Sequence, residues 1–152
     1  MSILYICKKT QIIEFNNIPS ILNPQSTAFV LESFISSCDY KVKKLLYNFV
    51  SKEVLYELNK KHLNHHTDTD IITFDYSSGK RLEAEIFISP WAIDRSAKRE
   101  GQTVEDETLR VLSHGVLHCM GHNDTTIVEK EQMRKLENQF IQMFHVKHRN
   151  HV

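Results

Sequence analysis

Two segments rich in β-branched and aromatic residues lie close together in the middle of the chain. They are DIITFDY (70–76) and LEAEIFIS (82–89), and the turn sequence SSGK lies between them. This spacing predicts a β-hairpin. Helical signals dominate from there to the C-terminus, so the fold must combine a small sheet with several helices. We therefore predict an α+β fold.

The other elements follow from the same periodicities. Further strands are expected in ILYIC (3–7), with QIIEF (11–15) as a second candidate, and in VKKLLYNFV (42–50). Helices are expected over 28–36, from Ser51 to about Lys61, from Pro90 to Gly101, over 108–120 and over about 127–144. The segment from Pro19 to Pro24 is expected to be a turn-rich connection. The result is a small mixed sheet of about four strands packed with about five helices.

Length and composition indicate one domain, residues 1–152, with a flexible tail from about residue 145. A chain of 152 residues, 41% hydrophobic and 25% charged, has the size of a single core. The 19 basic and 19 acidic residues balance, so an RNA partner requires a local basic patch. Two groups of histidines are expected to be solvated, with weak RNA contact as the alternative for the tail. They are His62, His65 and His66 in a polar loop, and His145, His148 and His151 in the tail.

The cysteines and the apolar segments indicate a soluble, cytoplasmic protein. Cys7, Cys38 and Cys119 lie far apart and form no C-x-x-C pair, which argues against a disulfide framework and a cysteine zinc site. Cys119 is expected to pack in the interior. The N-terminal ILYIC is too short for a signal peptide, and no apolar run approaches the roughly 20 residues of a membrane span.

Three histidines at four-residue spacing end the helix predicted over 108–120, in the sequence SHGVLHCMGHND (113–124). His114 and His118 are one turn apart and project from one helix face, which suits two imidazoles on one metal ion. On a straight helix, His122 would lie about 12 Å along the axis from His114. That distance is too long for all three to bind one ion.

Gly121 changes the path of the chain after these histidines. A glycine in the left-handed conformation at a helix C-terminus turns the chain back, which would return Asp124 to the site. We therefore predict a zincin-like metal helix with three ligands, His114, His118 and Asp124, and an open position for water. Zn²⁺ is the expected ion, and iron, manganese or nickel are alternatives.

Gly115 bears on the reaction class. In the metallopeptidase pattern H-E-x-x-H, the glutamate after the first histidine is the general base. Its absence here argues against a peptidase of that kind, and we expect the missing side chain to leave room beside the ion for a phosphodiester. Hydrolysis stays feasible because a bound metal lowers the pKa of its water.

The sequence HGVLHCMGHND resembles the signature of the YbeY family of bacterial metal-dependent endoribonucleases. Those enzymes act in ribosomal RNA maturation, notably at the 3′ end of the small-subunit RNA, and in ribosome quality control. The similarity includes LNKKHLNHHTDTDIITFDY and LEAEIFIS and extends from about Leu58 to Asp124. It implies an α+β domain, a zinc ion at the mouth of a cleft and a basic groove for RNA.

Taken residue by residue, the resemblance implies that His114 and His118 are ligands and that Asp124 replaces a third histidine. His122 stands where the family more often has tyrosine, so it is interpreted as a neighbour of the ligands or a substrate contact. Glu85 matches an aspartate of the family and is expected to orient water near the ion. The expected catalytic residues are therefore His114, His118 and Glu85.

The largest departure from the family is Leu63, which stands in place of an arginine. An arginine is a natural phosphate clamp, so its loss is expected to weaken catalysis. Thr69 and Asp70 match the family's TD. Five basic residues could supply charge instead, or could belong to solvated helix faces: Lys60, Lys61, Arg95, Lys98 and Arg99.

The predicted function is thus a single-strand-specific, zinc-dependent endoribonuclease that matures the 3′ end of 16S rRNA. Its expected partners are small-subunit RNA and the ribosome or its proteins, without DNA or a membrane. Two alternatives stay open. One is a metal-dependent hydrolase of a peptide or small molecule, and the other is a ribosome-associated binding protein with a structural metal.

Overall fold

A four-stranded sheet in the order β1-β2-β4-β3 organises the fold in the computed structural model, which describes residues 12–63 and 69–149. The strands are β1 (Ile13–Asn16), β2 (Lys41–Phe49), β3 (Ile71–Asp75) and β4 (Arg81–Ile88). β2 lies parallel to both β1 and β4, whereas β3 and β4 form the predicted antiparallel hairpin. β3 is therefore an edge strand.

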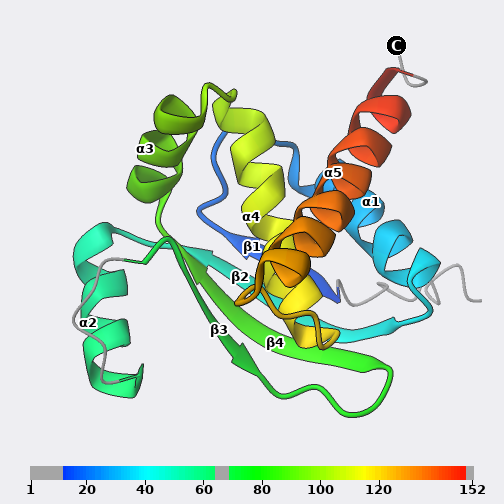
Figure 1. Ribbon diagram of the computed structural model, residues 1–152, viewed down its shortest axis with the longest axis horizontal. Helices are drawn as coiled ribbons and strands as arrows, with labels where there is room; N and C mark the ends of the chain where they lie inside the picture. Colours follow the sequence, from blue (N-terminus) through cyan, green and yellow to red (C-terminus); the bar gives the residue numbers. More distant parts are fainter. Residues whose placement is uncertain (1–11, 64–68, 150–152) are drawn as a thin grey trace, which may run out of the picture.

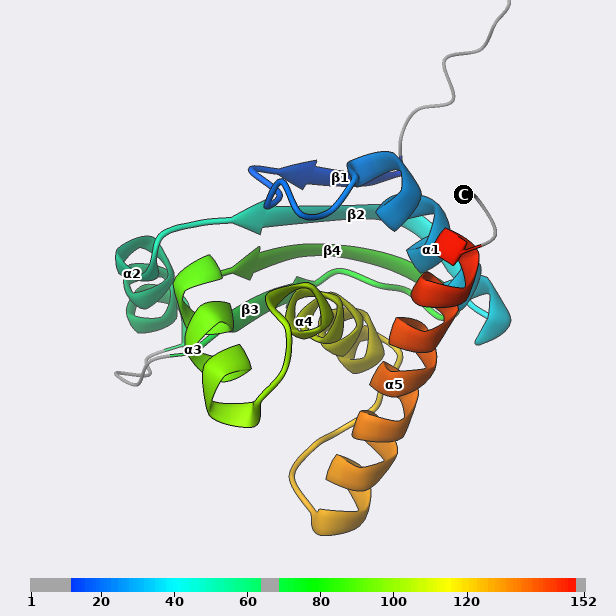
Figure 2. The same ribbon diagram turned by 90° about the horizontal axis from the view of Figure 1, so that it is seen from above.

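Five helices accompany this sheet. They are α1 (Pro24–Ser37), α2 (Lys52–Leu63), α3 (Pro90–Glu100), α4 (Val104–Cys119) and α5 (Ile127–Arg149). Figure 1 shows α1, α4 and α5 above the sheet, and Figure 2 shows α2 beyond the ends of the strands. The predicted α+β class, with about four strands and five helices, is confirmed.

The core lies between one face of the sheet and the helices. Along β4, Leu82, Ala84, Ile86 and Ile88 are buried, while the residues between them are more exposed. Because successive side chains of a strand point to opposite faces, the four buried residues share the helix-covered face. They form one hydrophobic cluster with residues of α1, α4 and α5, which include Phe34, Leu112 and Phe140.

Helix α4 is held on the sheet by two tyrosines, Tyr47 of β2 and Tyr40, the residue immediately before β2. The buried Tyr47 hydroxyl donates a hydrogen bond to the Leu112 carbonyl oxygen at 2.9 Å. The Tyr40 hydroxyl donates to the Met120 carbonyl oxygen at 3.0 Å, at the end of α4. A hydrogen bond of this kind contributes about 1 kcal/mol. The helix that carries the histidines is thus fixed at its centre and at its C-terminus.

Two helices begin earlier than the sequence predicted. α1 starts at Pro24, in the expected turn region, and α4 starts at Val104 rather than near residue 108. The side chains of Asn23 and Thr103 accept hydrogen bonds from the first turns of these helices. Pro24 occupies the first helical position, where its missing N–H costs nothing. The proline therefore opens a helix instead of belonging to a turn.

The C-terminal segment is also more ordered than predicted. α5 continues to Arg149, and the Nε2 atom of His145 lies 2.6 Å from Asp106 Oδ1 in the first turn of α4. The prediction of a flexible tail starting at about 145 is therefore wrong, because this contact extends the docked part of the helix. Residues 150–152 lie outside the described residues, as do ILYIC (3–7), His65 and His66.

His62 does not lie in a loop. It belongs to the last turn of α2, is exposed, and its ring is edge-on to Phe74 of β3 with centroids 5.5 Å apart. The loop prediction for His62 is therefore wrong, because α2 continues past Lys61 to Leu63. None of the helices over residues 12–63 and 69–149 combines the length and apolar character needed to cross a membrane.

Candidate metal centre

The two histidines of α4 and the aspartate that follows it come together at the C-terminus of the helix. His114 Nε2 lies 3.0 Å from His118 Nε2 and 3.3 Å from Asp124 Oδ2. His118 Nε2 lies 3.5 Å from the same carboxylate oxygen. Gly121, with φ +91°, ends the helix in the left-handed conformation that the turn back requires. The turn after α4 therefore brings Asp124 next to the two histidines, as predicted from their spacing in the sequence.

These three atoms have the geometry of a metal site. A triangle with sides of 3.0, 3.3 and 3.5 Å has its corners about 1.9 Å from its centre, slightly less than the ~2.0–2.1 Å of zinc–nitrogen and zinc–oxygen bonds. An ion just outside the plane can therefore reach all three atoms without rearrangement. The donor set of two imidazoles and one carboxylate fits zinc and leaves a fourth position open. Their assignment as metal ligands stays a prediction.

His122 does not join this group. Within residues 12–63 and 69–149, the group of possible ligand atoms within 4.8 Å of one another at this place comprises His114, His118 and Asp124. The backbone N–H of His122 donates to the Leu117 carbonyl oxygen at 3.0 Å as part of the turn after α4. The geometry therefore favours Asp124 as third ligand, on the grounds anticipated from the helix length.

His114 and His118 line a cleft of about 300 Å³ between α4 and the edge strand β3. Its wall on the β3 side is formed by Ile71, Ile72, Thr73 and Asp75. Apolar side chains on one wall limit the access of water, and polar groups at the far end keep the cleft accessible to a polar substrate. The site thus has room for a substrate group beside the ion.

Two oppositely charged side chains, the buried Glu137 and the partly buried Arg110, hold His114 in place. Glu137 of α5 accepts a hydrogen bond from His114 Nδ1 at 2.7 Å, and its other oxygen lies 3.2 Å from Arg110 Nη1. Because a carboxylate only accepts, Nδ1 must carry the proton and Nε2 is left free for a metal. Glu107 extends this group, with its Oε2 atom 3.8 Å from Arg110 Nε.

The surroundings of His114 change its protonation. Burial lowers the pKa of His114, but the hydrogen bond and charge of Glu137 and the charges of Asp124 and Asp70 outweigh it and raise the pKa above 6.5. A second proton therefore competes with a metal at Nε2 of His114. The Cys119 thiol beside the site is different, because burial and Asp75 raise its pKa to about 12 and keep it neutral. Its expected packing role is consistent with that neutral state.

Gly115 does not face the ion. A Cβ atom at this position would lie 3.1 Å from Ile71 Cδ1 and 3.1 Å from Ile86 Cδ1, so the residue points into the sheet. The expectation that the missing side chain leaves room for a phosphodiester is therefore wrong. The physical reason is that His114 points towards the cleft and the next residue, about 100° further around the helix, points towards β3 and β4.

Glu85 also lies elsewhere. It alternates along β4 with Ala84 and Ile86, which face α4, so its side chain is on the opposite face of the sheet. Its neighbours across the sheet are Leu46 and Phe74. The predicted role of Glu85 as a catalytic residue near the ion is therefore wrong. The resemblance placed Glu85 within a strand but did not determine towards which face of the sheet its side chain points.

The remaining residues considered in the sequence analysis do not line this cleft among the described residues. Thr69 and Asp70 immediately precede β3, and Leu63 is the last residue of α2. Arg95 and Arg99 lie on α3 in a neighbouring cavity.

Glu137 is the site residue that the sequence analysis missed. A glutamate on the apolar stripe of α5, four residues after the buried Met133 and three before the buried Phe140, was the signal that could have revealed it.

Comparison with known proteins agrees with this geometry. The model of the family described as Endoribonuclease YbeY matches residues 10–145. A relative named Endoribonuclease YbeY from Flavobacterium johnsoniae is 38% identical over 127 residues, which are 84% of this chain and 91% of that protein. The protein of the same name from Bacteroides thetaiotaomicron is 37% identical over 125 residues, 82% of this chain and 90% of that one.

A solved structure supports the fold independently. The solution structure of TM1509 from Thermotoga maritima matches with a TM-score of 0.65 and 22% identity, over 91% of this chain and 93% of that chain. The family resemblance predicted from HGVLHCMGHND is confirmed, and with it, at the level of the family, the expected endoribonuclease function. The chain belongs to the endoribonuclease YbeY family.

Proposed function

We propose that this protein is a zinc-dependent endoribonuclease that cleaves single-stranded RNA near the 3′ end of the small-subunit ribosomal RNA. One observation carries the proposal: atoms of His114, His118 and Asp124 lie 3.0–3.5 Å from one another, and the two histidines line a cleft. The name of the relatives supports the reaction class. Because the proposed substrate is ribosomal RNA, we expect the protein to act in the cytoplasm with ribosomes as partners.

A bound metal ion would lower the pKa of its water and stabilise negative charge on a phosphoryl oxygen. The protein's own part is to position. Glu137 holds the proton of His114 on Nδ1 and directs Nε2 at the site. The carboxylate of Asp124 and the two histidines would hold the ion, and the negative charge of Asp124 would partly offset that of the metal. Arg110 keeps Glu137 in place from the other side.

The lack of a glutamate after His114 distinguishes this site from a metallopeptidase. Position 115 is a glycine packed against Ile71 and Ile86, so no side chain can act from there as a general base. This arrangement favours RNA over the peptide substrate of the alternative hydrolase. It also agrees with an open fourth position, which a purely structural zinc site lacks.

Leu63 leads to a second part of the proposal. The resemblance implies an arginine there, and a positioned cation on developing phosphoryl charge is typically worth a few kcal/mol, or about 10² to 10³ in rate. We infer that the isolated protein is slow and that the ribosome positions the RNA and supplies some of the missing charge. The substitution Leu63→Arg should then speed cleavage by the isolated protein and reduce the benefit of added ribosomes.

The experiment uses protein purified without an affinity tag and analysed for bound metal. Zinc-loaded protein should cleave a single-stranded fragment containing the 3′ end of small-subunit RNA, leave a duplex of the same sequence intact and fail to digest casein. The His118→Ala variant, prepared in parallel, serves as the blank for contaminating nuclease.

Three results would contradict parts of this proposal. Equal cleavage by wild type and His118→Ala would assign the activity to a contaminant. Cleavage restored by manganese or iron but not by zinc would reject the choice of metal. Stoichiometric metal without any cleavage, even with ribosomes present, would favour the binding protein with a structural metal.

A further inference from the structure

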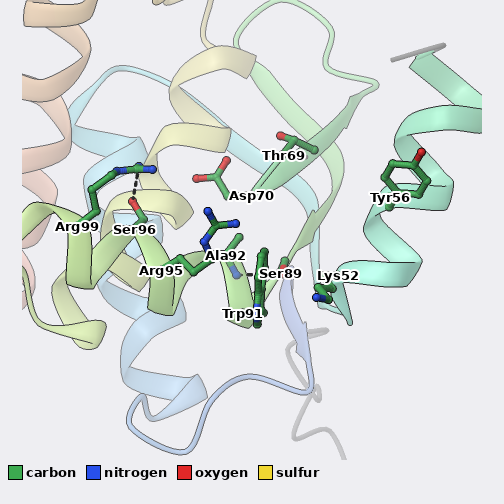
Figure 3. A pocket seen from close by; sticks show the side chains of 10 residues that line it. All are labelled: Lys52, Tyr56, Thr69, Asp70, Ser89, Trp91, Ala92, Arg95, Ser96 and Arg99. Atoms are coloured by element: carbon green, nitrogen blue, oxygen red, sulfur yellow. Dashed lines mark hydrogen bonds between the residues drawn. The ribbon is translucent and has the colours of Figure 1, made fainter. Parts of the chain in front are cut away.

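A second cavity, of about 410 Å³, lies between α2 and α3 and has no part in the metal centre (Figure 3). α2 contributes Lys52 and Tyr56, and α3 contributes Trp91 and Arg95. Thr69 and Asp70, which immediately precede β3, also line it. We call this cavity the α2–α3 pocket.

Two cations of the pocket are arranged around one aromatic ring. Lys52 Nζ lies 4.4 Å and Arg95 Cζ 4.6 Å from the centroid of the Trp91 ring. Figure 3 shows the indole between the two side chains. Cation–π contacts at these distances hold the two charges in place without neutralising them. Trp91 therefore acts as a positioning residue for both cations.

The charge of the pocket favours an anionic ligand. Within residues 12–63 and 69–149, neither Lys52 nor Arg95 has a carboxylate at salt-bridge distance. Arg99, also in the lining, already lies 3.3 Å from Glu100 Oε1. Asp70 is the carboxylate among the described residues that line the pocket. Two unneutralised cations against one carboxylate leave the pocket positive, which suits a phosphate group.

The exposed aromatic rings narrow the class of anion. Trp91 is 40% and Tyr56 37% exposed, although both are large side chains that a fold usually buries more fully. Cations beside exposed aromatic faces are the combination by which proteins hold single-stranded nucleic acid, with phosphates on the cations and bases against the rings. A nucleotide of an RNA strand fits this lining better than an isolated inorganic anion.

Consecutive residues of the chain line the pocket and the metal cleft. Thr69 and Asp70 line the pocket, and the next residues, Ile71 and Ile72, line the cleft beside the histidines. Consecutive residues of an extended chain advance only about 3.3 Å each. Asp70 is also close enough for its charge to act on His114. One strand of RNA can therefore occupy both places.

We propose that the α2–α3 pocket is a binding subsite for the RNA substrate, away from the bond that is cut. Lys52 and Arg95 bind one backbone phosphate, and the rings of Trp91 and Tyr56 contact a neighbouring base. The proposal rests on the proposed endoribonuclease function, since it assumes that the strand continues into the metal cleft. It also supplies cationic charge in a chain that has Leu63 in place of an arginine.

Trp91 allows a test that does not depend on catalysis, because it is the only tryptophan of the chain. Binding of a single-stranded oligoribonucleotide should change its fluorescence. The titration is made with the His118→Ala variant, so that the RNA stays intact. Anisotropy of a labelled oligoribonucleotide gives the dissociation constant independently of any change in the indole itself.

Lys52→Gln and Arg95→Gln, each added to His118→Ala, should weaken RNA binding by about tenfold, as expected for the loss of a charge-assisted contact. Each should also reduce the dependence of log K on log salt, by at most about 0.7, the value for the one phosphate that both side chains bind. Lys98→Gln is the matched control, because it removes the same charge from α3 outside the pocket. It should change both quantities much less.

The outcomes separate this proposal from the proposed function. If Lys52→Gln and Arg95→Gln match Lys98→Gln in affinity and salt dependence, the subsite is wrong even when the wild type cleaves RNA. If the wild type does not cleave RNA but the fluorescence and affinity results hold, the subsite stands and the enzyme assignment falls. A nucleoside monophosphate that changes Trp91 fluorescence as strongly as the oligoribonucleotide would show a mononucleotide site and overturn the proposal.

Discussion

Replacement of Gly115 by alanine tests how α4 meets the sheet. The new Cβ would lie 3.1 Å from the Cδ1 atoms of Ile71 and Ile86, and overpacking of this kind costs about 1–3 kcal/mol. Alanine in a helix interior gains about 1 kcal/mol over glycine. Both contacted atoms are terminal methyl groups that can shift, so the cost should be near 2 kcal/mol. We expect a net loss of about 1 kcal/mol in the free energy of unfolding.

Ile86→Val removes one of the two methyl groups and should make room for the alanine. By itself it should cost about 1 kcal/mol. The double variant should be more stable than the sum of the single effects by about 0.5–1 kcal/mol, since the clash and the missing methyl compensate. Ile35→Val in α1 removes an equally buried methyl group that is not among the atoms nearest Gly115, so it should combine additively with Gly115→Ala.

Urea unfolding of the wild type and of these five variants measures the coupling, and chelator competition measures the zinc affinity of each. Gly115→Ala should keep the zinc affinity within a few-fold of wild type, because its Cβ points away from the three ligands. A loss of zinc affinity beyond tenfold with unchanged stability would refute the reasoning. It would mean that position 115 faces the ion after all.

Three further predictions concern the metal centre. Glu137→Gln should lower zinc affinity by about 10- to 100-fold, the usual effect of changing a partner of a ligating histidine, which competition with a chromogenic chelator would detect; an unchanged affinity would contradict the role of Glu137. Asp124→Ala should lose at least about tenfold in zinc affinity while His122→Ala keeps most of it, and the reverse order in a metal titration would overturn the ligand assignment. The pKa of His114 is raised above 6.5, so zinc affinity should fall as pH drops through that raised value. The metal-free protein should instead lose stability as pH rises through it, because Glu137 stabilises the protonated state of His114. Calorimetry of both forms between pH 5 and 8 checks the two opposite signs, and a flat profile of zinc affinity would argue against imidazole ligation.

Local patterns were sufficient where the relevant residues lie on one element. His114 and His118 share a helix face because their separation is one turn, and Gly121 turns the chain because its φ of +91° suits glycine. The hairpin of β3 and β4 followed from two nearby β-rich segments and a turn. Interactions within about ten residues determine such features, so they are visible in the sequence itself.

Errors arose where a choice between two faces depended on distant segments. Gly115 follows a predicted ligand in the sequence and Glu85 was itself assigned to the site. The packing of α4 on β4, however, directs Gly115 into the sheet and Glu85 to its other side. A strand or helix pattern shows which residues share a face, and only the tertiary contacts show what covers that face.

Tertiary structure alone also brought together residues from separate elements. Glu137 reaches His114 from 23 residues further along the chain, because α5 packs along α4. Lys52 and Trp91 meet because α2 and α3 lie side by side at the ends of the strands. The sequence by itself determined the family, and it placed the two histidines of the predicted metal site on one helix. Packing between distant elements decided that Glu137 is the partner of His114 and that α2 and α3 form a pocket, because no local sequence pattern encodes how distant elements lie relative to one another.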